Sequence, residues 1–203
     1  KRVTGVQTCA LPISKAAIFS ENRPEWIYAF YATLQNNAIP VPIDFMASAE
    51  DVAYILDDCQ PEWMFVSSAM KDHLPEIDRK TTHKPELIVF EEIRPDESVK
   101  ESEWIGPEDY GTTAVIIYTS GTTGSPKGVM LSFENLLANV EAVTVGVPIY
   151  GPEERVLMLL PLHHIFPLLG TLVIPLQIGA TVALSPSLRA EDIIRTLQDN
   201  RIT

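Results

Sequence analysis

One stretch of the chain combines the residue types that bind phosphate groups. Residues 118–128 read Tyr-Thr-Ser-Gly-Thr-Thr-Gly-Ser-Pro-Lys-Gly. Glycines let the backbone turn tightly and bring its N–H groups close to an anion. The serine and threonine hydroxyls donate hydrogen bonds, and the ammonium group of Lys127 supplies a point charge on a flexible stem. Together these groups predict a cradle for a phosphate chain.

The local charge and the position of the lysine refine this prediction. Between Gly111 and Phe133 there is no Asp or Glu, and Lys127 is the only Lys or Arg. A Walker A loop has the form G-x-x-x-x-G-K-[ST] and opens a helix. Here the lysine follows a proline and leads into the strand-like residues 129–131. We therefore expect a loop that joins two strands and folds over a triphosphate; the alternative is an ordinary Ser/Gly surface turn.

Adjacent histidines mark a second candidate site. His163 and His164 lie in the segment Leu-Pro-Leu-His-His-Ile-Phe-Pro-Leu, inside a stretch, 156–188, that has no Asp, Glu, Lys or Arg. Taken alone, either residue could be a core histidine with its hydrogen bonds satisfied. A membrane-spanning helix needs about 20 apolar residues, but prolines and glycines interrupt this stretch. A buried helix between two strands fits it better, and peripheral membrane contact stays open.

Both segments resemble motifs of the AMP-forming adenylating enzymes, which include acyl-CoA synthetases, luciferases and the adenylation domains of peptide synthetases. Residues 118–128 resemble the signature loop of this superfamily, and 160–168 resemble its following motif, in which a proline, a histidine and an aromatic residue line the acyl pocket. Residues 19–26 and 38–44 resemble the family's opening βα segment and next strand. The residue strings Glu-Asn-Arg-Pro-Glu-Trp and Pro-Leu-His-His-Ile-Phe are most similar to those of long-chain fatty acyl-CoA synthetases.

The resemblance implies a reaction. A carboxylate attacks the α-phosphorus of ATP and gives an acyl-adenylate and pyrophosphate, and a thiol, usually coenzyme A, then takes the acyl group. The first step collects negative charge on the phosphates, so we expect catalysis by charge stabilisation and positioning. The implied ligands are a fatty acid, ATP, Mg²⁺ and coenzyme A.

The resemblance also assigns roles to individual residues. The implied catalytic residues are Lys127, Thr122 and His164, with His163 as the second choice for the junction of ATP and acyl chain. Thr119 is expected to help to hold Mg²⁺ through its hydroxyl. The residues expected to bind the nucleotide phosphates are Thr119, Ser120, Gly121, Thr122, Thr123, Gly124 and Lys127.

Alternating strand-like and helix-like segments must position these residues. Such alternation implies βαβ units, so the expected fold class is α/β, with parallel-rich sheets and packed helices. Pro40 and Pro42 suit an edge strand. Apolar runs predict strands at 15–20, 38–43, 62–66, 86–90, 113–118, 129–131, 155–160 and 180–184. Helix starts and one-sided apolar faces predict helices from Pro24 to Leu34, after a cap at Ser48, at 69–77, after a cap at Ser132, at 165–176 and at 189–201.

The composition narrows the class of protein. The 203 residues are 46% hydrophobic and 21% charged, which is typical of a globular protein. A net charge of −12 argues against a nucleic-acid partner, because such a protein needs a basic face. Cys9 and Cys59 have no CxxC spacing, which predicts reduced thiols in a cytoplasmic protein, with association at the membrane periphery left open. The oligomeric state is not predicted.

The ends and the middle of the chain suggest its organisation. We interpret residues 1–14 as a non-native or disordered leader, because they resemble translated sequencing-adapter text. Residues 15–203 are expected to be part of the large N-terminal AMP-binding domain, incomplete at both ends and inactive alone. Residues 91–109 hold eight acidic and two basic residues and predict a solvated connection.

Three functions stay open at the level of sequence. The first is activation of a fatty acid and its transfer to coenzyme A. The second is adenylation of another carboxylic acid, or transfer to an acyl-carrier-protein thiol. The third is a non-catalytic nucleotide-binding or membrane-associated module.

Overall fold

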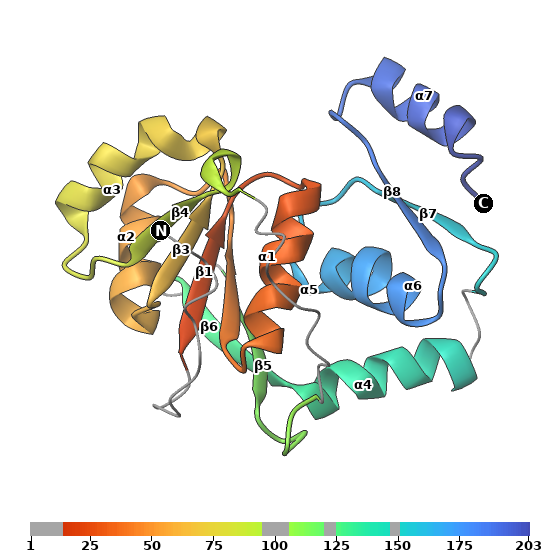
Figure 1. Cartoon of the computed structure of the whole chain (residues 1–203), viewed down its shortest axis with the longest axis horizontal. Helices are drawn as coiled ribbons and strands as arrows, with labels where there is room; N and C mark the ends of the chain where they lie inside the picture. The colour runs from red at the N-terminus through yellow and green to blue at the C-terminus, as the bar shows by residue number, and fades with distance from the viewer. Residues whose placement is uncertain (1–13, 95–105, 120–124, 147–150) are drawn as a thin grey trace. The chain divides into compact units, whose positions relative to one another are not determined.

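The computed structural model describes residues 14–94, 106–119, 125–146 and 151–203. The chain divides into two compact units, Lys1–Ser132 and Phe133–Thr203, and each is described by itself (Figure 1). Strands and helices alternate along both units, and the parallel strands with packed helices confirm the predicted α/β fold class.

A parallel sheet forms the centre of the first unit. Its described strands stand in the order β2-β1-β3-β4, and every neighbouring pair runs parallel. The proline-containing strand β2 lies at an edge of this sheet, as predicted, because proline has no N–H to give to a second neighbour. The strands are β1 (Lys15–Phe19), β2 (Ile39–Ile43), β3 (Trp63–Val66) and β4 (Glu86–Val89).

Helices cover this sheet, and Figure 1 shows α1 on one side of it and α2 and α3 on the other. Side chains alternate along a strand, so Ala17 and Phe19 join the core cluster with α2, while Ile18 is buried on the opposite face. The bounds of the helical segments are α1 (Pro24–Gln35), α2 (Ala49–Cys59), a 3-10 turn (Ser68–His73), α3 (Leu74–Lys80) and a second 3-10 turn (Phe90–Glu92).

Local sequence explains where these helices start. Pro24 lies in the first turn of α1, where its missing N–H costs nothing. Ser48 caps α2, because its Oγ accepts the backbone N–H of Asp51 at 3.1 Å. The single helix predicted at 69–77 was wrong in form: a 3-10 turn leads into α3, and Pro75 lies in the first turn of the new helix.

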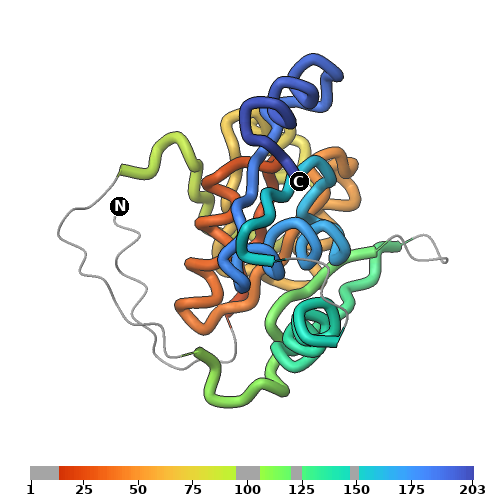
Figure 2. Tube along the Cα trace, turned by 90° about the vertical axis from the view of Figure 1, so that its right-hand side faces the viewer, coloured from red at the N-terminus to blue at the C-terminus, as the bar shows by residue number. Residues whose placement is uncertain are grey.

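A β-hairpin completes the described part of the first unit. Strands β5 (Thr113–Thr119) and β6 (Lys127–Ser132) pair antiparallel in a sheet of their own, and β5 packs next to β2. In Figure 2 the two strands run side by side in green. The hairpin confirms that the glycine loop joins two strands, although β6 is longer than the predicted strand at 129–131.

The second unit also follows the predicted order of elements. Strands β7 and β8 pair parallel, and the run 165–177 between them is apolar, with Leu168 and Leu172 fully buried. This run is not the uniform helix expected, because part of it is a wider π-helix between two prolines, which cannot donate the N–H of a regular ladder. The elements are α4 (Phe133–Glu141), a π turn (Ala142–Gly146), β7 (Arg155–Met158), α5 (Ile165–Pro167), the π segment (Leu168–Val173), α6 (Ile174–Gln177), β8 (Thr181–Leu184) and α7 (Ala190–Asp199).

Within the described residues, none of the helices combines the length and the apolar character that crossing a bilayer requires.

Candidate functional site

The hairpin brings together two of the predicted site residues. Thr119 is the last residue of β5, Lys127 is the first of β6, and they are direct partners in the register of the hairpin. Directly opposite residues in an antiparallel pair share a face, with Cβ atoms roughly 5 Å apart. Both residues are exposed. A hydroxyl and an ammonium group therefore stand side by side where the glycine loop leaves the hairpin.

The other predicted loop residues cannot be placed. Ser120, Gly121, Thr122, Thr123 and Gly124 lie outside the described residues, so their phosphate-binding roles stay predictions.

Strand β5, one side of the stem of the loop, is tightly packed. The β-branched residues Val115, Ile116 and Ile117 are at most 7% exposed, so β5 is buried on both faces. Gly128 lies close to two side chains of β5: a Cβ there would lie 3.1 Å from both Ile116 Cγ2 and Tyr118 Cζ. That spacing is shorter than ordinary van der Waals contact, so a larger residue would need these two side chains to shift by a few tenths of an ångström.

Tyr118 connects the stem to α2. Its hydroxyl donates a hydrogen bond of 2.5 Å to Asp58 Oδ2 at the end of that helix. Burial, followed by this hydrogen bond, raises the pKa of Tyr118 above its usual range, so the hydroxyl keeps its proton and remains a donor. Burial also raises the pKa of the neighbouring Cys59 thiol to about 11. Cys59 is free, as predicted, and its protonated thiol is a poor nucleophile; Cys9 lies outside the described residues.

The two histidines of the second candidate site differ in exposure. His163 is 7% exposed, whereas His164 lies at the surface, and their ring centroids are 4.1 Å apart. His164 occupies the cap position before α5, where its carbonyl accepts the N–H of Leu168 at 3.0 Å. Phe166, 73% exposed, follows two residues later. An accessible imidazole and an exposed aromatic ring in one short segment offer both polar and apolar contacts to a ligand.

The described residues offer little to a metal ion on their own. Among them there is no group of three or more His, Cys, Asp or Glu that could hold one. The Thr119 hydroxyl is an oxygen ligand of the kind Mg²⁺ accepts, but Mg²⁺ bound with a nucleotide takes most of its ligands from phosphate and water. The metal role of Thr119 therefore stays a prediction.

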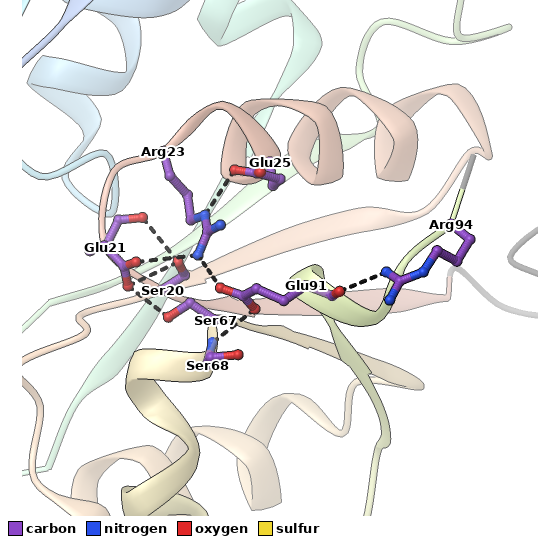
Figure 3. Close-up of polar contacts among 8 residues, drawn as sticks. All are labelled: Ser20, Glu21, Arg23, Glu25, Ser67, Ser68, Glu91 and Arg94. Carbon is purple, nitrogen blue, oxygen red and sulfur yellow. Dashed lines mark hydrogen bonds and ion pairs between the residues drawn. The ribbon is translucent and has the colours of Figure 1, made fainter. Parts of the chain in front are cut away.

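A polar cluster at the carboxyl ends of β1, β3 and β4 did not emerge from the sequence. Figure 3 shows the Arg23 guanidinium between three carboxylates. Its nitrogens lie 2.6 Å from Glu91, 2.8 Å from Glu25 and 3.5 Å from Glu21. Ser67, fully buried, donates to the Glu21 carboxylate at 2.7 Å.

The charged groups of this cluster form ion pairs with one another. Partial burial disfavours the charged form of Glu91, but hydrogen bonds, above all from Arg23, outweigh it and lower the pKa of the carboxyl to about 2. The hydrogen bond to Glu25 and that to Glu91 raise the pKa of Arg23 above its usual range. Open α/β sheets often bind ligands at this edge. Here the polar groups instead link the strand ends to one another.

Only a weak signal in the sequence points to this cluster. Glu91 opens the acidic stretch that was predicted to be a solvated connection, and its partner Arg23 lies 68 residues earlier. A pairing over that separation is visible only once β1 and β4 have been placed in one sheet.

Comparison with known proteins covers almost the whole chain. The sequence model of the family described as "AMP-binding enzyme" matches residues 11–203.

Curated relatives match most of the chain at moderate identity. An indoleacetate–CoA ligase of Aromatoleum aromaticum is 29% identical over 201 residues, covering 94% of the chain and 39% of that protein. A long-chain-fatty-acid–AMP ligase of Mycobacterium marinum is 31% identical over 185 residues, covering 87% of the chain and 32% of that protein. The chain thus spans about a third of the length of these two relatives.

Solved structures share the fold. The O-succinylbenzoate coenzyme A synthetase of Bacillus subtilis, solved in complex with AMP, is 27% identical with a TM-score of 0.79, covering 94% of the chain and 48% of that structure. The same synthetase in complex with ATP and magnesium ion is 25% identical with a TM-score of 0.77, covering 94% of the chain and 49% of that structure.

Proposed function

Because the chain belongs to the family of AMP-binding enzymes, we propose that it is part of a ligase that uses ATP to activate a carboxylic acid. The acid would form an acyl-adenylate with release of pyrophosphate, and the acyl group would then pass to coenzyme A. The observation that carries this proposal is the pairing of Thr119 with Lys127 at the mouth of the glycine loop.

The stem of the hairpin suits a triphosphate ligand. Lys127 is exposed at the start of β6, and the sequence of the loop that it closes has hydroxyl side chains, glycines and no acidic residue. In the proposed reaction the Lys127 ammonium stabilises the charge that collects on the β- and γ-phosphates. Ser120, Thr122 and Thr123 with Gly121 and Gly124 would complete the cradle, and Thr119 would contact Mg²⁺.

The second unit would contribute residues that bind the carboxylic acid substrate. We assign His164, the exposed member of the pair, to the junction of ATP and acyl chain, with His163 as second choice. Phe166 and Leu160, both more than half exposed, would contact the apolar part of the acid.

A fatty acid is the proposed substrate. The residue sequence around His164 and the similarity to a long-chain-fatty-acid–AMP ligase support it. An aryl acid is the second candidate, because an indoleacetate–CoA ligase and an O-succinylbenzoate coenzyme A synthetase match nearly the same part of the chain.

Organisation and location follow from the same proposal. Residues 15–203 would form part of a larger adenylating domain, with little activity alone. Residues 1–13 lie outside the described residues. We assign the protein to the cytoplasm, with no nucleic-acid partner, and leave peripheral membrane contact open.

Acid-dependent exchange of pyrophosphate into ATP tests the proposal on the full reading frame that contains this chain. Palmitate, indole-3-acetate and a reaction without acid separate the two substrate classes. Lys127→Ala should lower the exchange rate by about 100-fold, because a charge-stabilising donor is lost. Lys80→Ala, an exposed lysine of α3, is the matched control and should leave the rate unchanged. An exchange rate that is the same with and without the carboxylic acid, or an undiminished rate in Lys127→Ala, would contradict the proposal.

A further inference from the structure

The hairpin that bears the candidate phosphate loop is attached to the rest of its unit by side chains. In the described residues β5 and β6 form a two-stranded sheet of their own, separate from the ladder of the β2-β1-β3-β4 sheet. Ile116 enters the core cluster, and Tyr118 packs against the same cluster. The direction in which the hairpin holds its loop therefore depends on these contacts.

Tyr118 stands one rung below the mouth of the loop. It pairs with Gly128, and the next rung outward is the pair Thr119 and Lys127. Because side chains alternate along a strand, Tyr118 and Gly128 share one face of the hairpin, and Thr119 and Lys127 share the other.

The space beside Gly128 is filled by the tyrosine ring. A Cβ on Gly128 would lie 3.1 Å from Tyr118 Cζ and 3.3 Å from its hydroxyl oxygen. The ring thus lies across β6 as well as β5, and its hydroxyl reaches Asp58 Oδ2 at 2.5 Å. A single side chain therefore contacts both strands of the stem and the end of α2.

We propose that the hydrogen bond between Tyr118 and Asp58 orients the hairpin so that Lys127 and its loop meet the phosphates of ATP. This inference rests on the proposed function and adds two positioning residues to it. Neither residue is assigned a contact with ATP. Both would act by fixing the orientation of the hairpin stem relative to α2.

Kinetics on the full reading frame test the inference. In Tyr118→Phe we expect the KM for ATP to rise about fivefold, the effect of one lost hydrogen bond of typical net strength, with kcat changed by less than about twofold and the KM for the acid unchanged. Asp58→Ala should give the same rise, and Tyr118→Phe combined with Asp58→Ala should give no further rise, because both remove one bond.

Conservative and control variants separate positioning from stability. Asp58→Asn keeps an oxygen that accepts the tyrosine hydroxyl and should restore most of the affinity for ATP. Tyr54→Phe removes a hydroxyl from an exposed tyrosine on the same helix and should change nothing. Gly128→Ala should displace the ring by a few tenths of an ångström and raise the KM for ATP even with the bonding groups present.

The outcomes distinguish this inference from the proposed function. If wild type shows acid-dependent exchange and Lys127→Ala abolishes it, while Tyr118→Phe and Asp58→Ala only lower the unfolding temperature, the pair is merely structural and the inference is wrong. If wild type shows no acid-dependent exchange, the proposed function fails and the inference falls with it.

Discussion

His163 and His164 are adjacent in sequence and opposite in exposure. The sequence could not choose firmly between them, since either fits a motif that requires one histidine near the acyl site. Their exposure separates the two roles: a ring that is 7% exposed supports packing, and a surface ring is available to a ligand.

Substituting each histidine should therefore give different results. His164→Ala should lower acid-dependent pyrophosphate exchange by about 10- to 100-fold with little change in stability. His163→Ala should lower the free energy of unfolding by about 1–3 kcal/mol, because a buried ring is removed. Urea unfolding and exchange assays on both variants measure this. Equal losses of stability in the two variants would contradict the assignment.

At the scale of elements, Asp57 ties the end of α2 to the turn at residues 81–83. Its Oδ1 accepts the Thr81 hydroxyl at 2.7 Å and the backbone N–H groups of Thr82 and His83, each at 2.8 Å. These donors, led by the Thr81 hydroxyl, lower the pKa of Asp57 from 3.8 to about 2. The carboxylate thus joins α2 to the segment that leads into β4.

This lowered pKa predicts acid sensitivity of the first unit. The unfolded chain takes up the proton at a higher pH than the folded one, so the stabilisation is present above about pH 4 and is lost as the pH falls toward 2. Asp57→Asn should lose about 1 kcal/mol at neutral pH and show a flatter decline in acid. Urea unfolding at about pH 6 and about pH 3 measures both effects. The exposed Asp72, changed to Asn, is the control, and an unchanged acid profile in Asp57→Asn would refute this account.

Patterns with a local cause were predictable from sequence. The apolar runs of β1 to β4, Pro24 in the first turn of α1, the cap at Ser48 and the hairpin around the glycine loop all follow from neighbours in sequence. The fold class rests on these patterns, whereas the pairing of Thr119 with Lys127 was not predicted, because the predicted strands 113–118 and 129–131 left both residues in the loop.

Features that join distant segments were not predictable. Arg23 meets Glu91 across 68 residues, and Tyr118 meets Asp58 across 60. Their side chains are common surface types, and nothing near them in sequence names the partner. The π segment was missed for another reason, because apolar periodicity does not distinguish a π-helix from an α-helix.

At the scale of the whole chain, charge is distributed unevenly. The net charge is −12, yet the loop region between Gly111 and Phe133 has a single charged side chain, that of Lys127. A local positive site can bind a small polyphosphate, whereas a duplex needs an extended basic face.

The chain should therefore discriminate between these anions. We expect duplex DNA to bind more weakly than a Kd of about 10⁻⁴ M at physiological salt, the weak end of non-specific binding. Fluorescence anisotropy with a labelled duplex, titrated with the chain at low and physiological salt, measures this. Micromolar binding with a steep salt dependence would show a basic face that the composition does not suggest.

The outer side of β6 has a mechanical consequence. Among the described residues β6 pairs with β5 alone, and its Val129 and Met130 are 44% and 68% exposed. A strand with one open side can accept another strand along its backbone. Any segment or molecule that docks there would stiffen the hairpin that carries Lys127, so the proposed binding of ATP phosphates would respond to a contact that touches no loop residue.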